Sequence, residues 1–337
     1  LVFKGLASEV LAMELRKDPI TRSWVVLGQT DEPPLTVDPC PLCPSAATGQ
    51  TLLALPAEGA WQVRVTPHTS PLYRIEGEVG RAAEGIYDKM RSVGAHEIVI
   101  ETPGHDRRLS QFSDEEIGMV FEAYKRRIAD LKHDSRFKYA TALKNQGRAA
   151  AAEWAHAHSE VIATTFVPRR VLYELRAAKA YFQEKERCVF CDIVRQEERA
   201  GKRVVDTQGD YVAFCPYASR VPFETWILGR KHNHQFEVPR AESRRRHLAA
   251  LVGRTLRRLE QISDAYHMVL HTSPNTGVRR GDPADYWKTI ADDYHWHIEI
   301  MPILPKGSRS YALKEIYFNT VMPEDSAKQL RALEASL

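Results

Sequence analysis

Two histidines separated by a single residue, His156 and His158, stand near the middle of the sequence, and Glu160 follows two residues later. The residues after them are rich in β-branched side chains, which favours a strand. Alternate side chains of a strand share one face, so the two imidazoles and the carboxylate would lie side by side. Such a group can bind a metal, pass protons or present a nitrogen nucleophile. A solvated strand that carries two histidines without a function is an equal alternative.

Four of the five cysteines form two C-x-x-C pairs, at Cys40/Cys43 and Cys188/Cys191. In a reducing compartment, paired thiols indicate metal or redox sites before disulfides. A single pair that opens a helix could be thioredoxin-like, but two pairs flanked by proline or charged residues favour zinc. The fifth cysteine, Cys215, stands between apolar residues and suits a buried position.

The elements that must position these residues occur in the same order in both halves of the chain. In the first half we expect strands at 61–67, 96–102, 137–144 and 160–167, and a helix that Ser113 caps and that ends at about residue 133. In the second half we expect strands at 211–214, 224–228, 267–271 and 295–300, and a helix at about 240–265. A cysteine pair precedes each series and an H-x-H motif lies near its end. The order predicts two copies of one α+β module, residues 13–175 and 176–337.

The repeat also groups each cysteine pair with two histidines of its own half. The first set is Cys40, Cys43, His105 and His156, and the second is Cys188, Cys191, His232 and His295. Two thiolates and two neutral imidazoles suit a closed, tetrahedral, structural zinc site. We therefore expect two zinc ions per chain, with the second histidine of each H-x-H motif left free of metal. A reduced knuckle without metal is the alternative for each pair.

Composition narrows the class of protein. The chain has 337 residues, of which 43% are hydrophobic and 27% charged, as is usual for soluble globular proteins. Its 47 basic and 44 acidic residues leave a net charge of +3, which predicts no nucleic-acid partner. No apolar run is long enough to cross a bilayer, and charges interrupt the apolar N-terminal stretch, which argues against a secretory signal. We expect a cytoplasmic enzyme with no membrane partner, and we expect residues 77–93 to form a surface loop.

Several segments carry a family resemblance. They are DPCPLCP (38–44), YDKMRSVGAHEIVIETPGH (87–105), KNQG (144–147) with the H-x-H-S that follows it, CVFCDI (188–193), PYASRVPFETWIL (216–228) and YHWHIEIMP (294–302). Together they resemble the galactose-1-phosphate uridylyltransferase family of the histidine-triad superfamily. The resemblance implies two histidine-triad-like modules, each an antiparallel sheet with flanking helices, in a chain that pairs as a homodimer. It also implies a reaction in which a histidine takes a nucleoside monophosphate from a nucleotide sugar and passes it to a sugar 1-phosphate.

The resemblance assigns roles to individual residues. His158 matches the nucleophile and His156 the zinc ligand before it, while Asn145 and Gly147 match positions near the phosphates. Lys144 would add positive charge there. Apart from the resemblance, His297 lies on one strand face with His295 and is expected to line the site opposite His158; a satisfied polar face of the sheet is an equal alternative. A neutral imidazole is a good nucleophile and a fair leaving group, and zinc on the neighbouring histidine would hold it in position.

The chain departs from the family pattern around the expected phosphate pocket. Glu160 replaces a glutamine and Glu153 ends the run that replaces Gly-x-Ser; residues 27–34, 68–70 and 310–315 also differ. Two carboxylates are unfavourable where phosphates bind. Arg148, Arg169 or Lys144 could neutralise them, a divalent cation or a cationic substrate group could lie between them, or the site could have lost transfer chemistry.

These observations leave three functions open. The leading one is a nucleotidyltransferase in which His158 and Glu160 are catalytic and Glu153 contacts a substrate, with a nucleotide sugar and a sugar phosphate as its small-molecule partners. The second is a nucleotide-sugar phosphorylase or hydrolase. The third is a non-catalytic nucleotide-binding scaffold. The positions that would select the base, the sugar and the acceptor are the ones that differ from the family.

Overall fold

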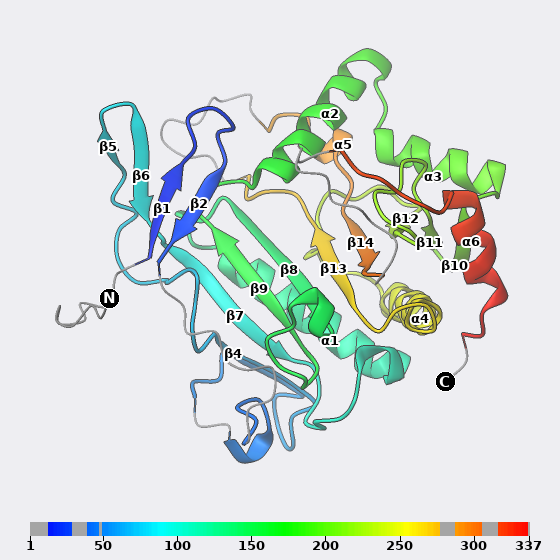
Figure 1. Cartoon of the computed structure of the whole chain (residues 1–337), viewed down its shortest axis with the longest axis horizontal. Helices are drawn as coiled ribbons and strands as arrows, with labels where there is room; N and C mark the ends of the chain where they lie inside the picture. Colours follow the sequence, from blue (N-terminus) through cyan, green and yellow to red (C-terminus); the bar gives the residue numbers. More distant parts are fainter. Residues whose placement is uncertain (1–12, 29–38, 47–48, 277–286, 305–315, 336–337) are drawn as a thin grey trace, which may run out of the picture.

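The computed structural model describes residues 13–28, 39–46, 49–276, 287–304 and 316–335. Within them, ten antiparallel strands form one large sheet with helices on both faces, and four more strands form a small second sheet (Figure 1). The expectation of an α+β fold with antiparallel sheets and flanking helices is confirmed. The expected differences at 310–315 and at most of 27–34 lie outside the described residues.

The large sheet is built from two halves with the same strand order. From the outer edge inward, the first half is β3 (Leu53–Leu55), β4 (Val63–Pro67), β7 (Gly94–Ile100), β9 (His158–Thr164) and β8 (Tyr139–Gln146). The second half is β10 (Val204–Gln208), β11 (Tyr211–Phe214), β12 (Thr225–Gly229), β14 (His297–Pro302) and β13 (Tyr266–His271). The halves join where β8 pairs with β13. In each half, the strand at or directly after the H-x-H motif, β9 or β14, lies second from the join.

Two long helices cover one face of this sheet. They are α1 (Asp114–Leu131) and α4 (Glu242–Glu260), one from each half. Ser113 caps α1 through a capping box with Glu116, as the sequence predicted. Their apolar sides pack with the inward side chains of both halves of the sheet into one continuous core, which includes Val161 of β9 and Ile298 of β14.

Two further helices, α2 (Arg169–Lys185) and α3 (Val189–Ala200), were not expected from the sequence. They pack on the opposite face of the second half of the sheet, where Leu175, Phe190 and Leu228 belong to one apolar cluster. Among the described residues, the same face of the first half carries a small apolar cluster. The proposed division at residue 175 falls inside α2, so this helix crosses the proposed boundary, and the division stays a proposal.

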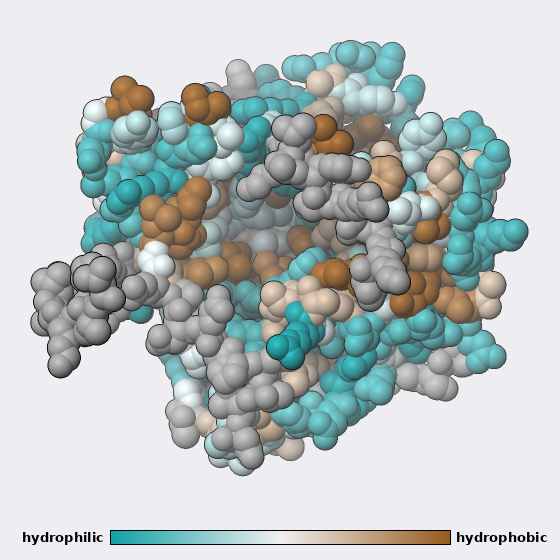
Figure 2. Space-filling view, in the orientation of Figure 1, coloured by the Kyte–Doolittle hydropathy of each residue, from teal (hydrophilic) through white to brown (hydrophobic). Residues whose placement is uncertain are grey.

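The second sheet corrects one expectation. Its strands are β1 (Glu14–Lys17), β2 (Trp24–Leu27), β5 (Ala82–Glu84) and β6 (Tyr87–Arg91), in the order β2-β1-β6-β5. Residues 82–91, expected in a surface loop, form a β-hairpin that turns at Gly85, where φ is +61°. The tips of the two hairpins are apolar, because Ile20 and Ile86 are 88% and 79% exposed. Figure 2 shows apolar patches over this part of the surface.

The remaining elements are short. They are η1 (Pro44–Ala46), η2 (Leu109–Gln111), η3 (Arg148–Ala150), α5 (Ile290–Asp293) and α6 (Pro323–Ala332). No described helix has the length and apolar character that a membrane span requires.

Candidate active site and metal centres

The first expected metal set comes together from four separate positions in the first half. Nδ1 of His156 lies 3.8 Å and 3.6 Å from the Sγ atoms of Cys40 and Cys43, and Nδ1 of His105 lies 3.4 Å from Sγ of Cys43. Burial lowers the pKa of His156, which keeps its imidazole neutral. Its Nε2 donates to the carbonyl of Thr102 at 2.8 Å, so the lone pair on Nδ1 faces the thiols.

The second set repeats this arrangement in the second half. Nδ1 of His232 and Nδ1 of His295 lie 3.4 Å and 3.6 Å from Sγ of Cys191. Cys188 ends the loop before α3 and Cys191 lies in its first turn, so the helix holds the pair. The hydrogen bond that the two thiols share lowers the pKa of Cys191 to about 3, as a metal-binding thiolate requires. Nε2 of His232 donates to the carbonyl of Ala291 at 2.8 Å.

Both sets have the donors of a tetrahedral zinc site. In each, the four ligand atoms lie within 4.8 Å of one another. Zn–S and Zn–N bonds of about 2.3 and 2.0 Å give a tetrahedral S···N edge of roughly 3.5 Å, which the S···N distances of 3.4 to 3.8 Å match. Both groups could therefore bind a metal.

His158, the first residue of β9, holds one fixed tautomer. Its Nδ1 lies 2.7 Å from the carbonyl oxygen of His156. A carbonyl can only accept, so Nδ1 carries the proton and Nε2 carries the lone pair. No described residue forms a hydrogen bond with Nε2. Burial and the nearby ammonium of Lys144 lower the pKa of His158 and keep the ring neutral.

Lys144 does not face this site as expected; it lies behind it. Its Nζ donates to Glu101 at 2.8 Å and to the backbone carbonyl of His158 at 2.9 Å, and it is 1% exposed. The hydroxyl of Tyr124 completes the group by donating to Ser159 at 2.7 Å. This charged cluster sits on the α1 side of the sheet and ties down the first residues of β9.

The two unexpected carboxylates are paired with two histidines that sequence reasoning missed. Oε2 of Glu160 lies 2.7 Å from Nε2 of His96, and Oε2 of Glu153 lies 2.8 Å from Nε2 of His68. The two imidazoles stack with centroids 4.0 Å apart. The sequence signal was present but weak: His96 directly precedes the glutamate of a clear strand, and His68 stands at the position that departs from the family pattern.

Both histidines are held as neutral donors. The backbone N–H of Leu72 donates to Nδ1 of His96 and that of Ser70 to Nδ1 of His68, which leaves the proton on each Nε2. Burial lowers the pKa of His96. Burial alone would raise the pKa of Glu160, but the hydrogen bond from His96 and the electrostatic effects of His96, His158 and His68 together outweigh it and lower that pKa. The carboxylate therefore stays charged beside His158.

Of the cations expected to neutralise these carboxylates, none is paired with them. Lys144 lies on the other face of the sheet. Arg169 donates to Tyr173, beyond the far end of β9, and Arg148 is exposed, without a described carboxylate partner. The imidazoles of His96 and His68 each accept at Nδ1 and donate from Nε2, so they are neutral partners that add no positive charge to the site.

Trp154 closes one side of the site. Its ring meets the ring of His158 edge-on, with centroids 5.1 Å apart, and lies 5.5 Å from the ring of His68. It belongs to the small apolar cluster of this face, and it is 4% exposed. The other tryptophan considered as a base platform, Trp296, is in the core.

Asn145 and Gly147 lie at the end of β8 beside these residues. Oδ1 of Asn145 accepts from His267 at 2.8 Å. Gly147 has φ of +81°, and a Cβ added there would lie 2.8 Å from the carbonyl oxygen of Asp264, so a side chain could not be accommodated.

His297 is not part of this group; it lies in the second half, covered by α2 and α3. Its ring stacks on those of His271, Phe190 and Trp226, at 4.5, 5.1 and 5.4 Å. It is fully buried, so the geometry does not support the expected substrate contact. Its Nδ1 donates to His295 at 3.1 Å, as in the first half.

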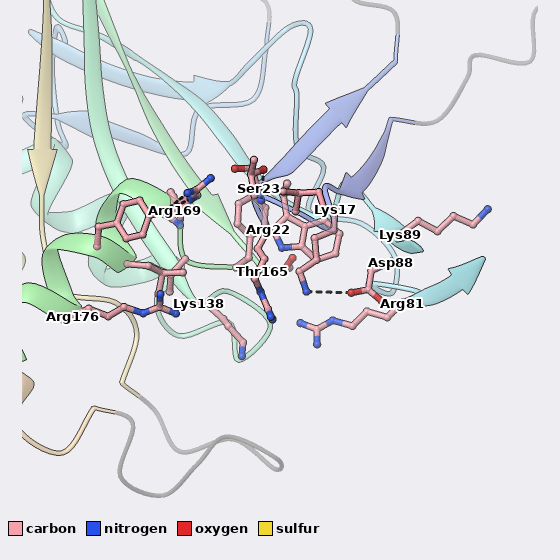
Figure 3. Close-up of a pocket in the computed structure, with 18 of the residues that line it drawn as sticks. Lys17, Arg22, Ser23, Arg81, Asp88, Lys89, Lys138, Thr165, Arg169 and Arg176 are labelled. Atoms are coloured by element: carbon pink, nitrogen blue, oxygen red, sulfur yellow. Dashed lines mark hydrogen bonds and ion pairs between the residues drawn. The ribbon is translucent and has the colours of Figure 1, made fainter. Parts of the chain in front are cut away.

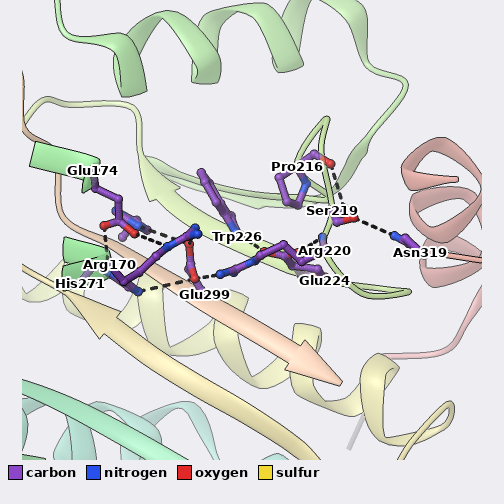
Figure 4. A network of polar contacts seen from close by, with 12 residues as sticks. Arg170, Glu174, Pro216, Ser219, Arg220, Glu224, Trp226, His271, Glu299 and Asn319 are labelled. Atoms are coloured by element: carbon purple, nitrogen blue, oxygen red, sulfur yellow. Dashed lines mark hydrogen bonds and ion pairs between the residues drawn. The ribbon is translucent and has the colours of Figure 1, made fainter. Parts of the chain in front are cut away.

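Oε1 of Glu299 lies 3.8 Å from Nε2 of His297, and Glu299 belongs to the network of charged groups that Figure 4 shows. Glu299 pairs with Arg220 at 2.6 Å, and His271 lies 3.1 Å from Glu174 and 3.6 Å from Glu299. Burial alone would lower the pKa of His271, but Glu174 and Glu299 outweigh it and raise that pKa to about 10. Arg170 also pairs with Glu174 at 3.1 Å, and Arg220 with Glu224 at 2.5 Å, so three cations pair with three carboxylates in this network.

Comparison with known proteins agrees with this arrangement. The model of the galactose-1-phosphate uridyl transferase N-terminal domain matches residues 73–168, and that of the C-terminal domain matches residues 174–335. The chain belongs to this family. Most of the described residues discussed above lie within these two matches.

Individual relatives extend over nearly the whole chain. An ADP-glucose phosphorylase from Arabidopsis thaliana is 29% identical and covers 97% of this chain and 95% of its own. A galactose-1-phosphate uridylyltransferase from Thermotoga maritima is 25% identical over 96% of this chain and 100% of its own. Among solved structures, a uridylyltransferase superposes with a TM-score of 0.78 at 27% identity, covering 95% of this chain and 98% of its own. An Arabidopsis ADP-glucose phosphorylase with bound ADP-glucose gives 0.75 at 28%, covering 96% and 99%.

Proposed function

We propose that this family member is a nucleotidyltransferase that moves a nucleoside monophosphate from a nucleotide sugar to a sugar 1-phosphate through His158. The observation that carries the proposal is the tautomer of His158. Its proton is fixed on Nδ1 by the carbonyl of His156, and its Nε2 lone pair has no hydrogen-bond partner among the described residues. The family relatives are enzymes of this class or ADP-glucose phosphorylases.

In the first step, Nε2 of His158 attacks the α-phosphorus of the nucleotide sugar. A P–N bond forms and the bond between the α-phosphorus and the bridging oxygen breaks, so the sugar 1-phosphate leaves with the electron pair. The ring then carries a positive charge, which the hydrogen bond from Nδ1 to the carbonyl of His156 stabilises. In the second step a phosphate oxygen of the acceptor attacks the same phosphorus and Nε2 leaves as a neutral imidazole.

The surroundings of His158 have separate tasks in this proposal. Lys144 fixes the backbone of His158 from behind and favours its neutral form. Glu160 lies two residues along the same strand face and stays ionised, so it favours the imidazolium form that the first step creates. Asn145, Gly147 and Glu153 border the site as substrate contacts. Zinc at both Cys₂His₂ sets, two ions per chain, would act as a structural brace that holds His156 and His295.

The acceptor has a second candidate. The Arabidopsis relative that matches 97% of this chain is an ADP-glucose phosphorylase, so inorganic phosphate is the alternative acceptor. We further propose a homodimer and a cytoplasmic location, in line with the sequence-based expectations.

The test is the mass of the intact protein after incubation with UDP-, ADP- or GDP-sugars. We expect one of them to add the mass of its nucleoside monophosphate, with no addition to His158→Ala. Discharge of that label by a sugar 1-phosphate, by phosphate or by water alone distinguishes transferase, phosphorylase and hydrolase. Saturable binding of a nucleotide sugar that survives His158→Ala, without label in either protein, would instead indicate a non-catalytic scaffold.

A further inference from the structure

A large cavity lies away from the site around His158. It has a volume of about 850 Å³ and lies between the small sheet, the residues after β9 and the start of α2. From its first residue, His158, β9 extends about 20 Å to Thr164 at roughly 3.3 Å per residue, and Thr165 and Phe166 line the cavity beyond that end. The cavity and the proposed nucleophile are therefore at opposite ends of one strand.

The cavity is strongly basic. Its described lining includes seven cationic side chains and one carboxylate. The cations are Lys17, Arg22, Arg81, Lys89, Lys138, Arg169 and Arg176, and the carboxylate is Asp88, which pairs with Lys17 at 3.1 Å. They come from the small sheet and its β1–β2 loop, from the residue before β8 and from α2, so residues distant in sequence bring their charges to one place. In Figure 3 the ends of Lys17, Arg22 and Arg81 point toward a common space.

Three of these cations have no partner that would account for their placement. Within the part of the chain that the structure describes, no carboxylate pairs with Arg22, Arg81 or Arg176. All three side chains are exposed, and like charges gathered around one cavity repel one another unless an anion balances them. Such a group of unpaired cations is expected where a bound anion balances their charge.

The start of α2 adds to the positive potential. No acidic residue stands in its first turn, and Pro168 provides no side-chain cap. Arg169 occupies the first helical position instead, although cations are unfavourable at the positive end of a helix. By contrast, α1 begins with three acidic residues.

We propose that this cavity binds a small anion with several linked phosphate groups, such as a tripolyphosphate chain. The volume is within the usual range for ligand pockets, and guanidinium and ammonium groups on several sides suit several phosphates better than one. Trp24 and Phe166, whose rings lie 5.9 Å apart, form an apolar wall that could contact a nucleoside attached to the chain. This site is separate from the one proposed for nucleotidyl transfer.

The test is calorimetric titration of the full chain with inorganic tripolyphosphate, with ATP and UTP as further arms. We expect one tripolyphosphate per chain, with binding retained in His158→Ala and weakened by added salt. The triple variant Arg22→Ala/Arg81→Ala/Arg176→Ala should weaken it at least ten-fold. Tighter binding of a nucleoside triphosphate than of tripolyphosphate would show that the base contributes.

A matched control removes the same charge elsewhere. Arg199, Arg246 and Lys328 are exposed and have no described ion-pair partner, so their triple alanine variant should bind as the unchanged protein does. A second test variant is Arg22→Gly, because Arg22 has φ of +58°, which glycine adopts without strain. Equal losses in the test and control triples, or no binding of tripolyphosphate or nucleoside triphosphate at low salt, would overturn the proposal.

Discussion

The two H-x-H motifs are built alike and surrounded differently. In both, the first histidine faces a cysteine pair and the second donates from Nδ1 to the carbonyl of the first, for His158 at 2.7 Å and for His297 at 3.1 Å. Both second histidines lie on the same face of the ten-stranded sheet. In the second half, α2 and α3 cover this face and stack Phe190 on the ring. In the first half, the described residues on this face form a small apolar cluster that includes Trp154.

The comparison of the two motifs distinguishes the features of the cysteine–histidine scaffold from the features that would serve a reaction. A cysteine pair and a fixed tautomer occur in both halves, so they do not by themselves indicate catalysis. Within the described part of the chain, two features distinguish His158: no helical layer covers it, and a part-exposed carboxylate lies beside it. The side chain of Glu160 is 15% exposed, while that of Glu299 is 2% exposed. In the second half, the same arrangement of the motif is part of a packed core.

The largest expected effect comes from removing one cysteine ligand from each Cys₂His₂ set in turn. Cys40→Ser and Cys188→Ser should each lower the zinc content from about two to about one per chain. Each should lower the free energy of unfolding by about 5 kcal/mol or more, because the metal contributes to folding. The loss should be larger for Cys188→Ser, since Cys188 is buried in the cluster under α2 and α3.

Elemental analysis and denaturant titration check this prediction. Cys215→Ser is the control, because Cys215 belongs to the core and to neither cysteine pair; its zinc content should not change. Zinc-free protein that is as stable as the zinc-bound form would contradict the prediction.

The second prediction compares substitutions at the second histidine of each H-x-H motif. His158→Ala should lower turnover of the labelled nucleotide sugar by about 10³-fold or more, since the nucleophile is lost. It should lower the melting temperature only slightly, because among the described residues the ring of His158 meets one aromatic ring edge-on and is not stacked in a cluster. His297→Asn should do the opposite, because it removes a fully buried, stacked ring. Turnover per folded molecule and thermal melts of both variants measure the contrast. Loss of labelling in folded His297→Asn would mean that the halves do not divide their tasks as proposed.

The third prediction concerns the layer behind each motif. Lys144→Met should lower the free energy of unfolding by about 3 kcal/mol, because it leaves the buried carboxylate of Glu101 without its cation. The double variant with Glu101→Gln should recover part of this loss. Behind the second motif the packing is apolar, so Met268→Leu should cost less than about 1.5 kcal/mol. Equal losses for Lys144→Met and Met268→Leu in urea titrations would show that the ion pair contributes nothing.

Much of the first half could be predicted from the sequence because its signals are local. The capping box at Ser113, the strand around Val99 and the spacing of the cysteine pairs each depend on a few neighbouring residues. The grouping of cysteines with histidines followed from the repeat, although the ligands are far apart in the chain.

What could not be predicted depends on contacts between distant residues. The partners of Glu153 and Glu160 are His68 and His96, 85 and 64 residues away, and no spacing rule links them. Helix α2 was missed because only three of its 17 residues are buried, which leaves a weak apolar pattern. The position of α2 explains the burial of His297. The missed helix and the expected substrate contact at His297 therefore have the same cause.

The smallest expected effect is a pH dependence confined to the second half. The pKa of His271 is raised to about 10 from an ordinary value of 6.5. A raised pKa means that protonated His271 stabilises the fold below about pH 6.5, and that this contribution decreases as the pH rises toward 10. The pKa of Glu174 is lowered to about 2, so its contribution is present above its ordinary value of 4.5 and is lost as the pH falls toward 2.

His271→Asn should therefore be less stable than the unchanged protein near pH 6 by about 2 kcal/mol, and the difference should shrink as the pH rises to 10. Urea titrations at a series of pH values measure it. His133→Asn, which alters an exposed histidine, should show no such trend. A difference between His271→Asn and the unchanged protein that stays constant with pH would mean that His271 is neutral in the folded chain. Arg170 and Arg220 would then be the described cations that pair with Glu174 and Glu299, and His271 would not belong to the closed ion-pair core that distinguishes the second half from the first.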